Sequence, residues 1–150
     1  MLVTNHVLSG AVIGATTRRI VPAFLLGVAS HFALDAAPHW KSRSLTLMQV
    51  AVPDGLTGLA VMSVMTAVAP RGRRAAVLAG MAGAALPDLD KPSRVFFGRS
   101  PFPRAVDRLH KVIQDEAPHR FKYELAAAAA FCAAAVGLLR VSAAAPRSAL

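Results

Sequence analysis

Histidine and aspartate side chains recur at intervals of four residues in the segment "SHFALDAAPHW", residues 30–40 of a largely apolar stretch. Residues four apart share one face of an α-helix, so His31, Asp35 and His39 are expected to project together. An ionisable side chain inside a bilayer costs about 2.5–3.5 kcal/mol on insertion scales, and lipid offers it no partner. These side chains are therefore expected to face a protein interior or a wet cavity, where histidine nitrogen and carboxylate oxygen can bind zinc, manganese or iron.

Further ligand-type residues occur elsewhere in the chain. In "ALPDLDKP", Pro87 ends a predicted helix, and Asp88 and Asp90 then emerge on a short irregular turn that can supply bridging carboxylates. With a histidine near the start of the chain, these residues complete the set of predicted metal ligands: His6, His31, Asp35, His39, Asp88 and Asp90. The sequence predicts a divalent metal without distinguishing zinc from manganese or iron. Asp54 and His110 are the candidate proton acceptor or donor for catalysis.

Each of these residues also has a purely structural interpretation. Asp35, Asp88 and Asp90 can cap helices or pair with nearby basic residues, whereas His39 can anchor the chain at a membrane surface and His6 can be hydrogen-bonded in a core. For one residue taken alone we favour the structural interpretation. For the whole group we favour metal binding, because buried ionisable groups are costly in an apolar chain unless they serve a function.

The elements that position these residues are predicted to be helices. Hydrophobic residues make up 55% of the chain and the mean hydropathy is +0.47, against roughly 45–50% apolar content in ordinary soluble domains. This composition predicts a helical membrane protein, and an alanine-rich soluble bundle is the alternative. Five apolar segments are expected to be helical: residues 21–37, 50–69, 125–139, 6–17 and 75–87. The last two, at about 12 or 13 residues, have a length typical of buried or re-entrant segments.

The fold prediction is an all-α, small polytopic membrane protein with about four to five membrane-embedded helices, forming a single domain over residues 1–141. The polar stretch over residues 91–123 carries an apolar stripe at helical spacing, formed by Val106, Leu109, Val112 and Ile113. That stripe predicts an amphipathic helix at the membrane interface. Residues 142–150 are predicted to be a disordered tail.

Counting crossings places the ligand-type residues at one membrane surface. If five segments run antiparallel, the start of the first, the end of the second, the start of the third and the end of the fourth lie on the same side. The opposite side carries "TTRR", "PRGRR" and Arg140, and no candidate ligand. Ion or proton transport is disfavoured, because it requires access from both sides.

The formal net charge of +9 invites a nucleic-acid interpretation. The basic residues lie between apolar runs, however, where loops contact anionic lipid headgroups, which argues against nucleic-acid binding. Arg94, Arg99 and Arg104 follow the aspartates closely and can attract or receive such a headgroup. Cys132 is the single cysteine, so neither an intrachain disulfide nor a zinc–thiolate cluster can form.

Three stretches, "NHVLSGAVIG", "GVASHFALDAAPHW" and "GAALPDLDKPSR", resemble the bacterial membrane-bound metal-dependent hydrolase family. "LPDLD" is similar to the LPDxD motif of that family and "SHFALD" to its SHxxLD motif. The resemblance implies a multi-pass protein of the bacterial inner membrane in which His6, His31, Asp35, Asp88 and Asp90 are metal-site residues. Two features depart from the family pattern: here SHxxLD precedes LPDxD, and the HRGxTH motif is missing.

Two functions therefore follow from the sequence. The first is a metal-dependent hydrolase that acts on a phosphoester or lipid-like substrate at the membrane surface. The alternative is a noncatalytic integral membrane protein in which the same residues form a structural metal site or a polar plug and the function is to bind a partner. The clustering of many ligands on one side favours the first, and the missing motif favours the second.

Overall fold

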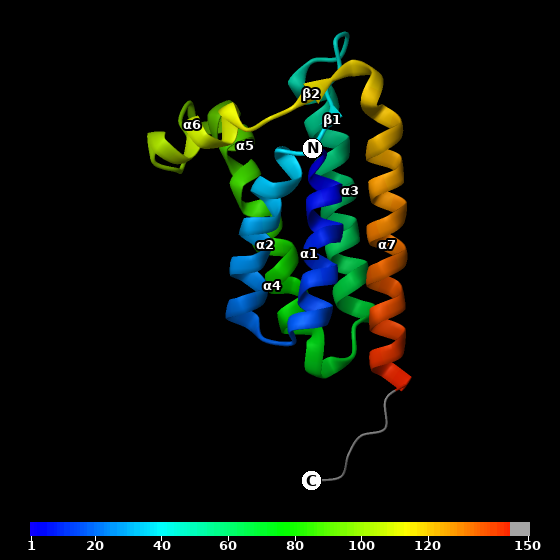
Figure 1. Ribbon diagram of the computed structural model, residues 1–150. Helices are drawn as coiled ribbons and strands as arrows, with labels where there is room; N and C mark the ends of the chain where they lie inside the picture. The colour runs from blue at the N-terminus through cyan, green and yellow to red at the C-terminus, as the bar shows by residue number, and fades with distance from the viewer. Residues whose placement is uncertain (145–150) are drawn as a thin grey trace.

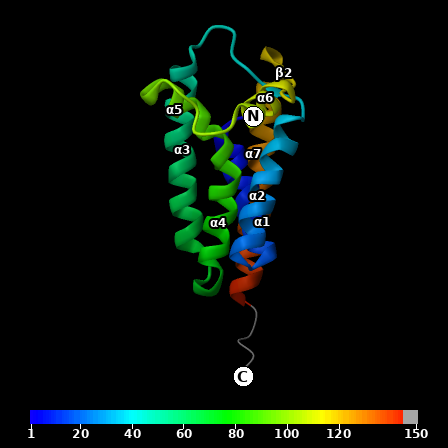
Figure 2. The same cartoon turned by 90° about the vertical axis from the view of Figure 1, so that its left-hand side faces the viewer.

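Long helices run side by side along one axis in the computed structural model, which describes residues 1–144 (Figures 1 and 2). The long helices are α1 (Val3–Thr17), α2 (Ile20–Asp35), α3 (Leu47–Val68), α4 (Arg74–Ala85) and α7 (Phe121–Ala144). The short elements are β1 (His39–Trp40), η1 (Arg71–Arg73), η2 (Leu86–Leu89), α5 (Asp90–Phe97), α6 (Arg104–Val112), β2 (Glu116–Ala117) and η3 (Pro118–Arg120). The prediction of an all-α protein is confirmed, because β1 and β2 are only two residues each and pair in parallel.

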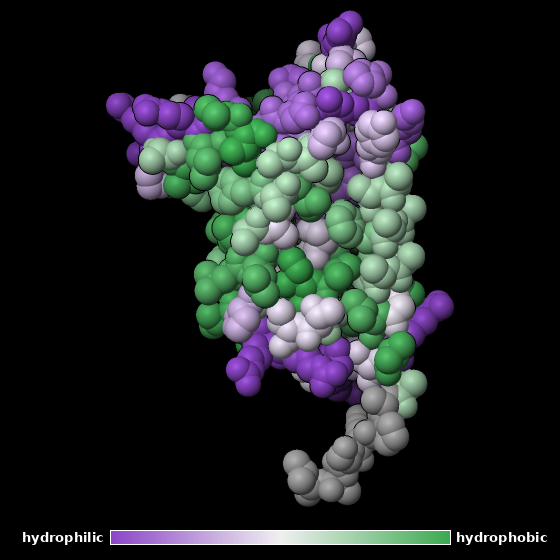
Figure 3. Space-filling view, in the orientation of Figure 1, coloured by the Kyte–Doolittle hydropathy of each residue, from purple (hydrophilic) through white to green (hydrophobic). Residues whose placement is uncertain are grey.

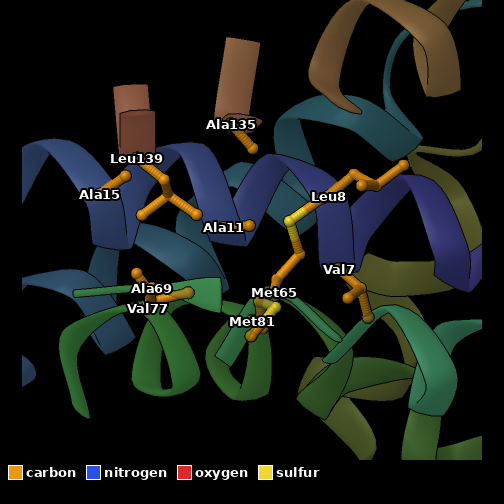
Figure 4. Packing of buried hydrophobic residues seen from close by; sticks show 10 residues of the cluster. All are labelled: Val7, Leu8, Ala11, Ala15, Met65, Ala69, Val77, Met81, Ala135 and Leu139. Carbon is orange, nitrogen blue, oxygen red and sulfur yellow. The ribbon is translucent and has the colours of Figure 1, made fainter. Parts of the chain in front are cut away.

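Helix α1 lies at the centre of the bundle and packs against α2, α3, α4 and α7, whereas α4 packs mainly against α1 and α2. The buried apolar cluster lies where α1, α3, α4 and α7 meet (Figure 4). Its members are Val7, Leu8, Ala11, Ala15, Met65, Ala69, Val77, Met81, Ala135 and Leu139. The small size of many of these side chains brings the helix axes close together.

Glycines at the contacts of α1, α2 and α4 set the shortest approaches between helices. A Cβ atom built on Gly10 would overlap the carbonyl oxygen of Gly80, and a Cβ atom on Gly80 would overlap the carbonyl oxygen of Gly10. Gly27 of α2 makes the same kind of approach to Gly80. The backbones of three helices therefore touch at one level of the bundle, in the way that small residues allow in membrane proteins.

Helix α3 begins one turn before the predicted start at residue 50. The Thr46 side chain accepts a hydrogen bond from the Gln49 backbone N–H, and the Gln49 side chain accepts one from the Thr46 backbone N–H. This capping box satisfies the free donors of the first turn, so the helix can start at Leu47. The apolar pattern alone does not reveal this start, because it lies outside the hydrophobic run.

Within residues 1–144, two helical stretches are long and apolar enough to cross a membrane, Leu47–Val68 and Pro118–Ala144. This number is smaller than the four to five membrane-embedded helices that we predicted. Helix α2, with 16 residues, is apolar but shorter, and α1 and α4 have 15 and 12 residues. About 20 residues are needed to span the hydrocarbon core of a bilayer, which explains the difference.

The surface of the bundle is apolar between two hydrophilic ends. Figure 3 shows green, hydrophobic residues over the middle of the visible face and purple, hydrophilic residues at both ends. Large apolar side chains are exposed along the outer helices, among them Val21, Leu25, Leu56, Leu59 and Val64. Soluble proteins rarely expose so continuous an apolar surface.

Helix α7 continues through Ala144. The prediction of a disordered tail from residue 142 is therefore wrong for residues 142–144, which extend the alanine-rich helix. The remainder of that predicted tail, residues 145–150, lies outside the described residues.

Candidate metal centre

Six ligand-type side chains converge at the end of the bundle where α1 begins and α2 ends. Helix α4 leads there into η2 and α5, and α6 lies at the same end of the molecule (Figure 1). The side chains fall into three overlapping groups of three, and within each group the ligand atoms lie within 4.8 Å of one another. The members are His6, His31, Asp35, Asp88, Asp90 and His110, which we call the His/Asp cluster. The crossing count anticipated this convergence at one end of the bundle.

His31, Asp35 and His110 form the tightest part of the cluster. The Asp35 Oδ2 atom lies 3.3 Å from His31 Nε2 and 2.9 Å from His110 Nε2, and the two Nε2 atoms are 3.1 Å apart. Two ligands bound about 2.1 Å from one ion at octahedral or tetrahedral angles are about 3.0–3.4 Å apart. These three atoms therefore already have nearly the spacing of three ligands on one face of a metal ion.

Asp88 and Asp90 form the outer part of the cluster. Asp88 Oδ1 lies 3.9 Å from His31 Nε2 and 3.7 Å from His110 Nε2, and Asp90 Oδ2 lies 3.9 Å from His110 Nδ1. Asp90 Oδ1 is buried and finds no hydrogen-bond partner among residues 1–144. An acceptor in that state is costly, and a cation would satisfy it.

Lys91 contacts both aspartates of this outer part. Its ammonium group donates a hydrogen bond to Asp88 Oδ1 and lies 3.7 Å from Asp90 Oδ1. Burial favours a raised pKa for Asp88, but the positive charge of Lys91, with smaller contributions from His6 and His31, lowers the pKa below its ordinary value. Asp88 is therefore a charged carboxylate at neutral pH, as a metal ligand must be.

The backbone of α4 orients the central histidine. His31 Nδ1 lies 2.8 Å from the carbonyl oxygen of Ala84 and donates to it. The Nε2 atom then carries the lone pair that points into the cluster, which is how an outer partner usually fixes a histidine that binds a metal. The ring of His6 stacks on the ring of His31 with centroids 3.9 Å apart, and His6 Nε2 lies 3.1 Å from Asp35 Oδ1.

The inner part of the cluster is shielded from solvent and the outer part is not. The His31 and Asp35 side chains are 0% and 1% exposed, whereas those of Asp88 and Asp90 are 12% and 16% exposed. Access to the cluster is therefore from the side of the two later aspartates. Asp35 also accepts hydrogen bonds from the backbone nitrogen of Met1 at 2.7 Å and from Gln114 Nε2 at 3.4 Å.

His39 does not join the cluster, although the spacing of four predicted that it would. Helix α2 ends at Asp35, and His39 lies beyond that end in β1, so it no longer shares the helix face. Its Nδ1 atom lies 2.9 Å from the carbonyl oxygen of Ala37, and its Nε2 atom lies 3.7 Å from Glu116 Oε1. The helical spacing rule failed here because the helix ends before Pro38, whose ring disfavours a helical conformation in the residue that precedes it.

Asp54 also lies outside the His/Asp cluster, and its contacts are those of a helix cap. Its carboxylate accepts hydrogen bonds from the backbone N–H of Val3 at 2.6 Å and of Thr4 at 3.1 Å. It also accepts one from the Thr4 hydroxyl at 2.6 Å. These bonds satisfy free donors in the first turn of α1, a structural role that an aspartate commonly fills.

Sequence reasoning passed over Glu124, which is 1% exposed and joins three elements. Its carboxylate accepts hydrogen bonds from Asn5 Nδ2 at 2.6 Å, from the Leu2 N–H at 3.2 Å and from the Trp40 N–H at 3.1 Å. This network ties α7 to β1 and to the first turn of α1, directly before His6. A single acidic residue in the apolar run "YELAAAAA" was the signal that could have revealed it.

The chain matches no protein-family model, no curated protein and no solved structure. The resemblance to the metal-dependent hydrolase family therefore rests on the motif residues alone. The geometry of the His/Asp cluster is the observation from which a function has to be argued.

Proposed function

We propose that this protein is a multi-pass integral protein of the bacterial inner membrane that binds a divalent metal at one surface of the bilayer and hydrolyses a phosphoester or lipid-like substrate there. The membrane placement is supported by the apolar middle of the molecule and by the two long apolar helices. Helices α1 and α4 are too short to span a bilayer alone, but α1 packs against α2, α3, α4 and α7, and α4 packs mainly against α1 and α2. Short segments of this kind are tolerated when protein surrounds them.

The observation that carries the metal proposal is the spacing of the three central ligand atoms. His31, Asp35 and His110 present two imidazole nitrogens and one carboxylate oxygen within 3.3 Å of one another. Such a set leaves other coordination positions open, as sites that bind water or substrate do. Asp88, Asp90 and His6 supply further ligand atoms beside it, so the cluster has room for one ion or for two sharing carboxylates.

A bound divalent ion would supply Lewis acidity and lower the pKa of a water molecule toward neutrality. The residues of the chain would orient the reactants around it. Asp88 and Asp90 lie at the open side, where a substrate would arrive, and Lys91 between them carries a positive charge that attracts an anionic group. His110 would bind the ion through Nε2, the atom that contacts Asp35, and its Nδ1 atom, 3.9 Å from Asp90 Oδ2, would then be the atom that holds or releases a proton.

The alternative is a noncatalytic membrane protein in which the cluster is a structural metal site or a polar plug that holds the bundle together for binding a partner. A specific observation favours it: the central side chains are almost fully buried, and Asp35 accepts hydrogen bonds from His6, His110 and Gln114. A hydrogen-bonded network of this kind can by itself fix a unique packing of helices.

Metal content of the detergent-purified full chain tests the proposal. After incubation with Zn²⁺, Mn²⁺ or Fe²⁺ and removal of excess ions, elemental analysis should find one or two equivalents of metal in the wild type. Asp35→Asn and the more exposed Asp88→Asn should each lower metal affinity by at least about tenfold, since a ligand is lost. Asp115→Asn is the matched control, because Asp115 is a half-exposed carboxylate at the same end that pairs with Arg120.

The outcomes separate the two functions. A wild type without metal, or metal that both cluster variants retain, would contradict the metal centre and leave the polar plug. If metal is present, hydrolysis of a chromogenic phosphodiester and of phospholipid should disappear with a chelator and return when the metal is restored. Stoichiometric metal with no hydrolysis of either substrate would favour the structural site.

A further inference from the structure

A short helical hairpin extends from the cluster end of the bundle. It consists of α5 and α6, residues 90–112, and we call it the arm. In Figure 1 the arm lies beside the upper end of the long helices and points away from them. Its position is at the level where the apolar middle of the molecule gives way to the hydrophilic end (Figure 3).

The arm is strongly basic, and most of its positive charge is unpaired. Residues 90–112 contain six lysines and arginines against two aspartates. Lys91 and Arg94 form ion pairs, with Asp88 and Asp107 respectively. Within residues 1–144, the other four basic side chains of the arm make no ion pair; they are Arg99, Arg104, Arg108 and Lys111.

Helix α6 divides its residues among three faces. Asp107 and His110 face inward, where they contact Arg94 and the cluster. Arg104, Arg108 and Lys111, spaced by four and three residues, form an exposed basic stripe. An exposed apolar stripe that includes Leu109 and Val112 lies next to it, and these two side chains are 51% and 75% exposed. A basic stripe beside an apolar stripe is the pattern of helices that lie in a lipid headgroup layer.

Helix α5 adds large exposed aromatic side chains to the arm. Phe96 is 71% exposed and Phe97 is 77% exposed, beside Val95 at 47%. Phe97, Arg99 and Ser100 line a hollow on the arm. Exposed phenylalanines are unfavourable in water, whereas at a membrane surface they insert below the headgroups while the neighbouring arginines bind phosphate.

The arm is held in shape by polar contacts. Asp107 of α6 accepts hydrogen bonds from Arg94 Nη2 at 2.6 Å and from Ser100 Oγ at 2.7 Å, and Ser93 Oγ donates to the carbonyl oxygen of Arg99 at 2.7 Å. These bonds join α5, the connecting loop and α6. The basic and apolar stripes therefore keep a fixed relation to each other.

The same two helices contribute residues to the His/Asp cluster. Asp90 is the first residue of α5, and His110 lies in the last turn of α6. A ligand bound to the arm would therefore lie at the open side of the cluster, where Asp88 and Asp90 are partly exposed.

We propose that the arm binds the headgroups of anionic phospholipids and delivers their phosphate to the His/Asp cluster, so that the substrate class of this protein is an anionic phospholipid. This inference rests on the proposed function, which it makes more specific. Charge complementarity identifies the occupant: unpaired arginines and lysine match phosphate, and adjacent exposed phenylalanines match acyl chains. An oligonucleotide would match the charge and could stack on the phenylalanines, but it has no acyl chains for the exposed aliphatic side chains Leu109 and Val112.

Lipid binding to the full chain in detergent tests this assignment. Wild-type protein is titrated with mixed micelles containing phosphatidylglycerol or phosphatidylcholine, and bound lipid is counted by native mass spectrometry. The arm variant Arg104→Gln, Arg108→Gln, Lys111→Gln removes the basic stripe. The matched control Arg19→Gln, Arg71→Gln, Arg140→Gln removes the same charge from exposed positions at the opposite end of the bundle.

The wild type and the control should bind phosphatidylglycerol more tightly than phosphatidylcholine. In the arm variant this preference should fall by at least about tenfold, because each basic residue near the surface contributes to the attraction of anionic lipid. Equal preference in both variants, or tighter binding of a short oligonucleotide than of phosphatidylglycerol, would overturn the assignment. Metal content is measured on the same samples and should be unchanged in the arm variant. A wild type that contains no metal but still prefers phosphatidylglycerol would contradict the metal centre and support the lipid-binding surface alone.

Discussion

The inner helices α1 and α4 and the outer helices α3 and α7 are all apolar, yet they occupy opposite environments. Most of α1 and half of α4 are buried, whereas only Gly58 and Met65 of α3 and three residues of α7 are buried. The inner helices have 15 and 12 residues and the outer ones 22 and 24. Hydrophobicity alone therefore does not tell which helices face protein and which face the surroundings.

The difference between the two pairs lies in small residues and in polar neighbours. Helices α1 and α4 meet through Gly10, Gly14 and Gly80, and they lead into the cluster through His6 and Asp88. Around Gly55 of α3 and Gly137 of α7 there is open space. The inner pair thus fixes the geometry of the site, and the outer pair packs against it mainly through α1.

The largest expected effect comes from separating the inner helices. Gly80→Leu places a side chain against the backbone of α1, and we expect it to lower the free energy of unfolding by more than about 4 kcal/mol or to prevent folding. Gly137→Leu, in open space on α7, should change it by less than about 1 kcal/mol. Thermal unfolding in detergent measures both, and equal effects would contradict the division into inner and outer helices.

A charge on the outer surface tests what surrounds it. Leu56 is 64% exposed near the middle of α3. If that surface faces lipid, Leu56→Arg should make the free energy of membrane insertion less favourable by about 2.5–3.5 kcal/mol. The control variant Ser44→Arg changes an exposed loop at the hydrophilic end, and its membrane insertion should equal that of the wild type. Partition between membrane and soluble fractions after expression is the measurement. If the wild type and Leu56→Arg are both found in the soluble fraction with equal stability, the membrane proposal is wrong.

The contact of an outer helix with an inner one gives a smaller effect. Asp54→Ala removes the cap that α3 provides to the first turn of α1, and should lower the free energy of unfolding by about 0.5–2 kcal/mol. Metal content should stay at the wild-type level, because Asp54 is outside the cluster. Loss of hydrolysis with metal content and stability retained would instead support the catalytic role predicted for Asp54.

The smallest effect has the opposite sign. Gly137→Ala on α7 should raise the free energy of unfolding by about 0.5–1 kcal/mol, because alanine restricts the unfolded chain and the added methyl group meets nothing within 4 Å. Calorimetry in detergent gives the change. A decrease would mean that α7 packs against another molecule at this position.

The sequence predicts the helices and one end of the bundle well, because hydrophobic runs and the alternation of crossings depend on local composition. It groups His6, His31, Asp35, Asp88 and Asp90 at one surface for the same reason. It includes His110 only as a candidate acid or base. This histidine lies in a polar segment, and no local sequence pattern shows that the segment folds back against the bundle. The structure brings it within 2.9 Å of Asp35.

The failures occur where a contact between distant segments replaces a local rule. His39 was expected to extend a helical stripe that ends at Asp35, and the cap that Asp54 places on α1 joins residues 50 positions apart. The link between Glu124 and Asn5 spans 119 positions. Periodicity cannot reveal such pairs, because each partner lies in a different segment.

The contact between Asp35 and His110 joins residues 75 positions apart in the chain, whereas His6 precedes Asp35 by only 29. At about 5–20 residues per second, a ribosome takes roughly 4–15 s to pass from one partner of the longer contact to the other. During that interval the Asp35 carboxylate can already contact Met1, His6 and His31, whereas His110 and Gln114 are still to be made. His6 and the first turn of α1 are therefore early partners of the buried Asp35 carboxylate, and the arm completes the cluster with His110 as a late step of biogenesis.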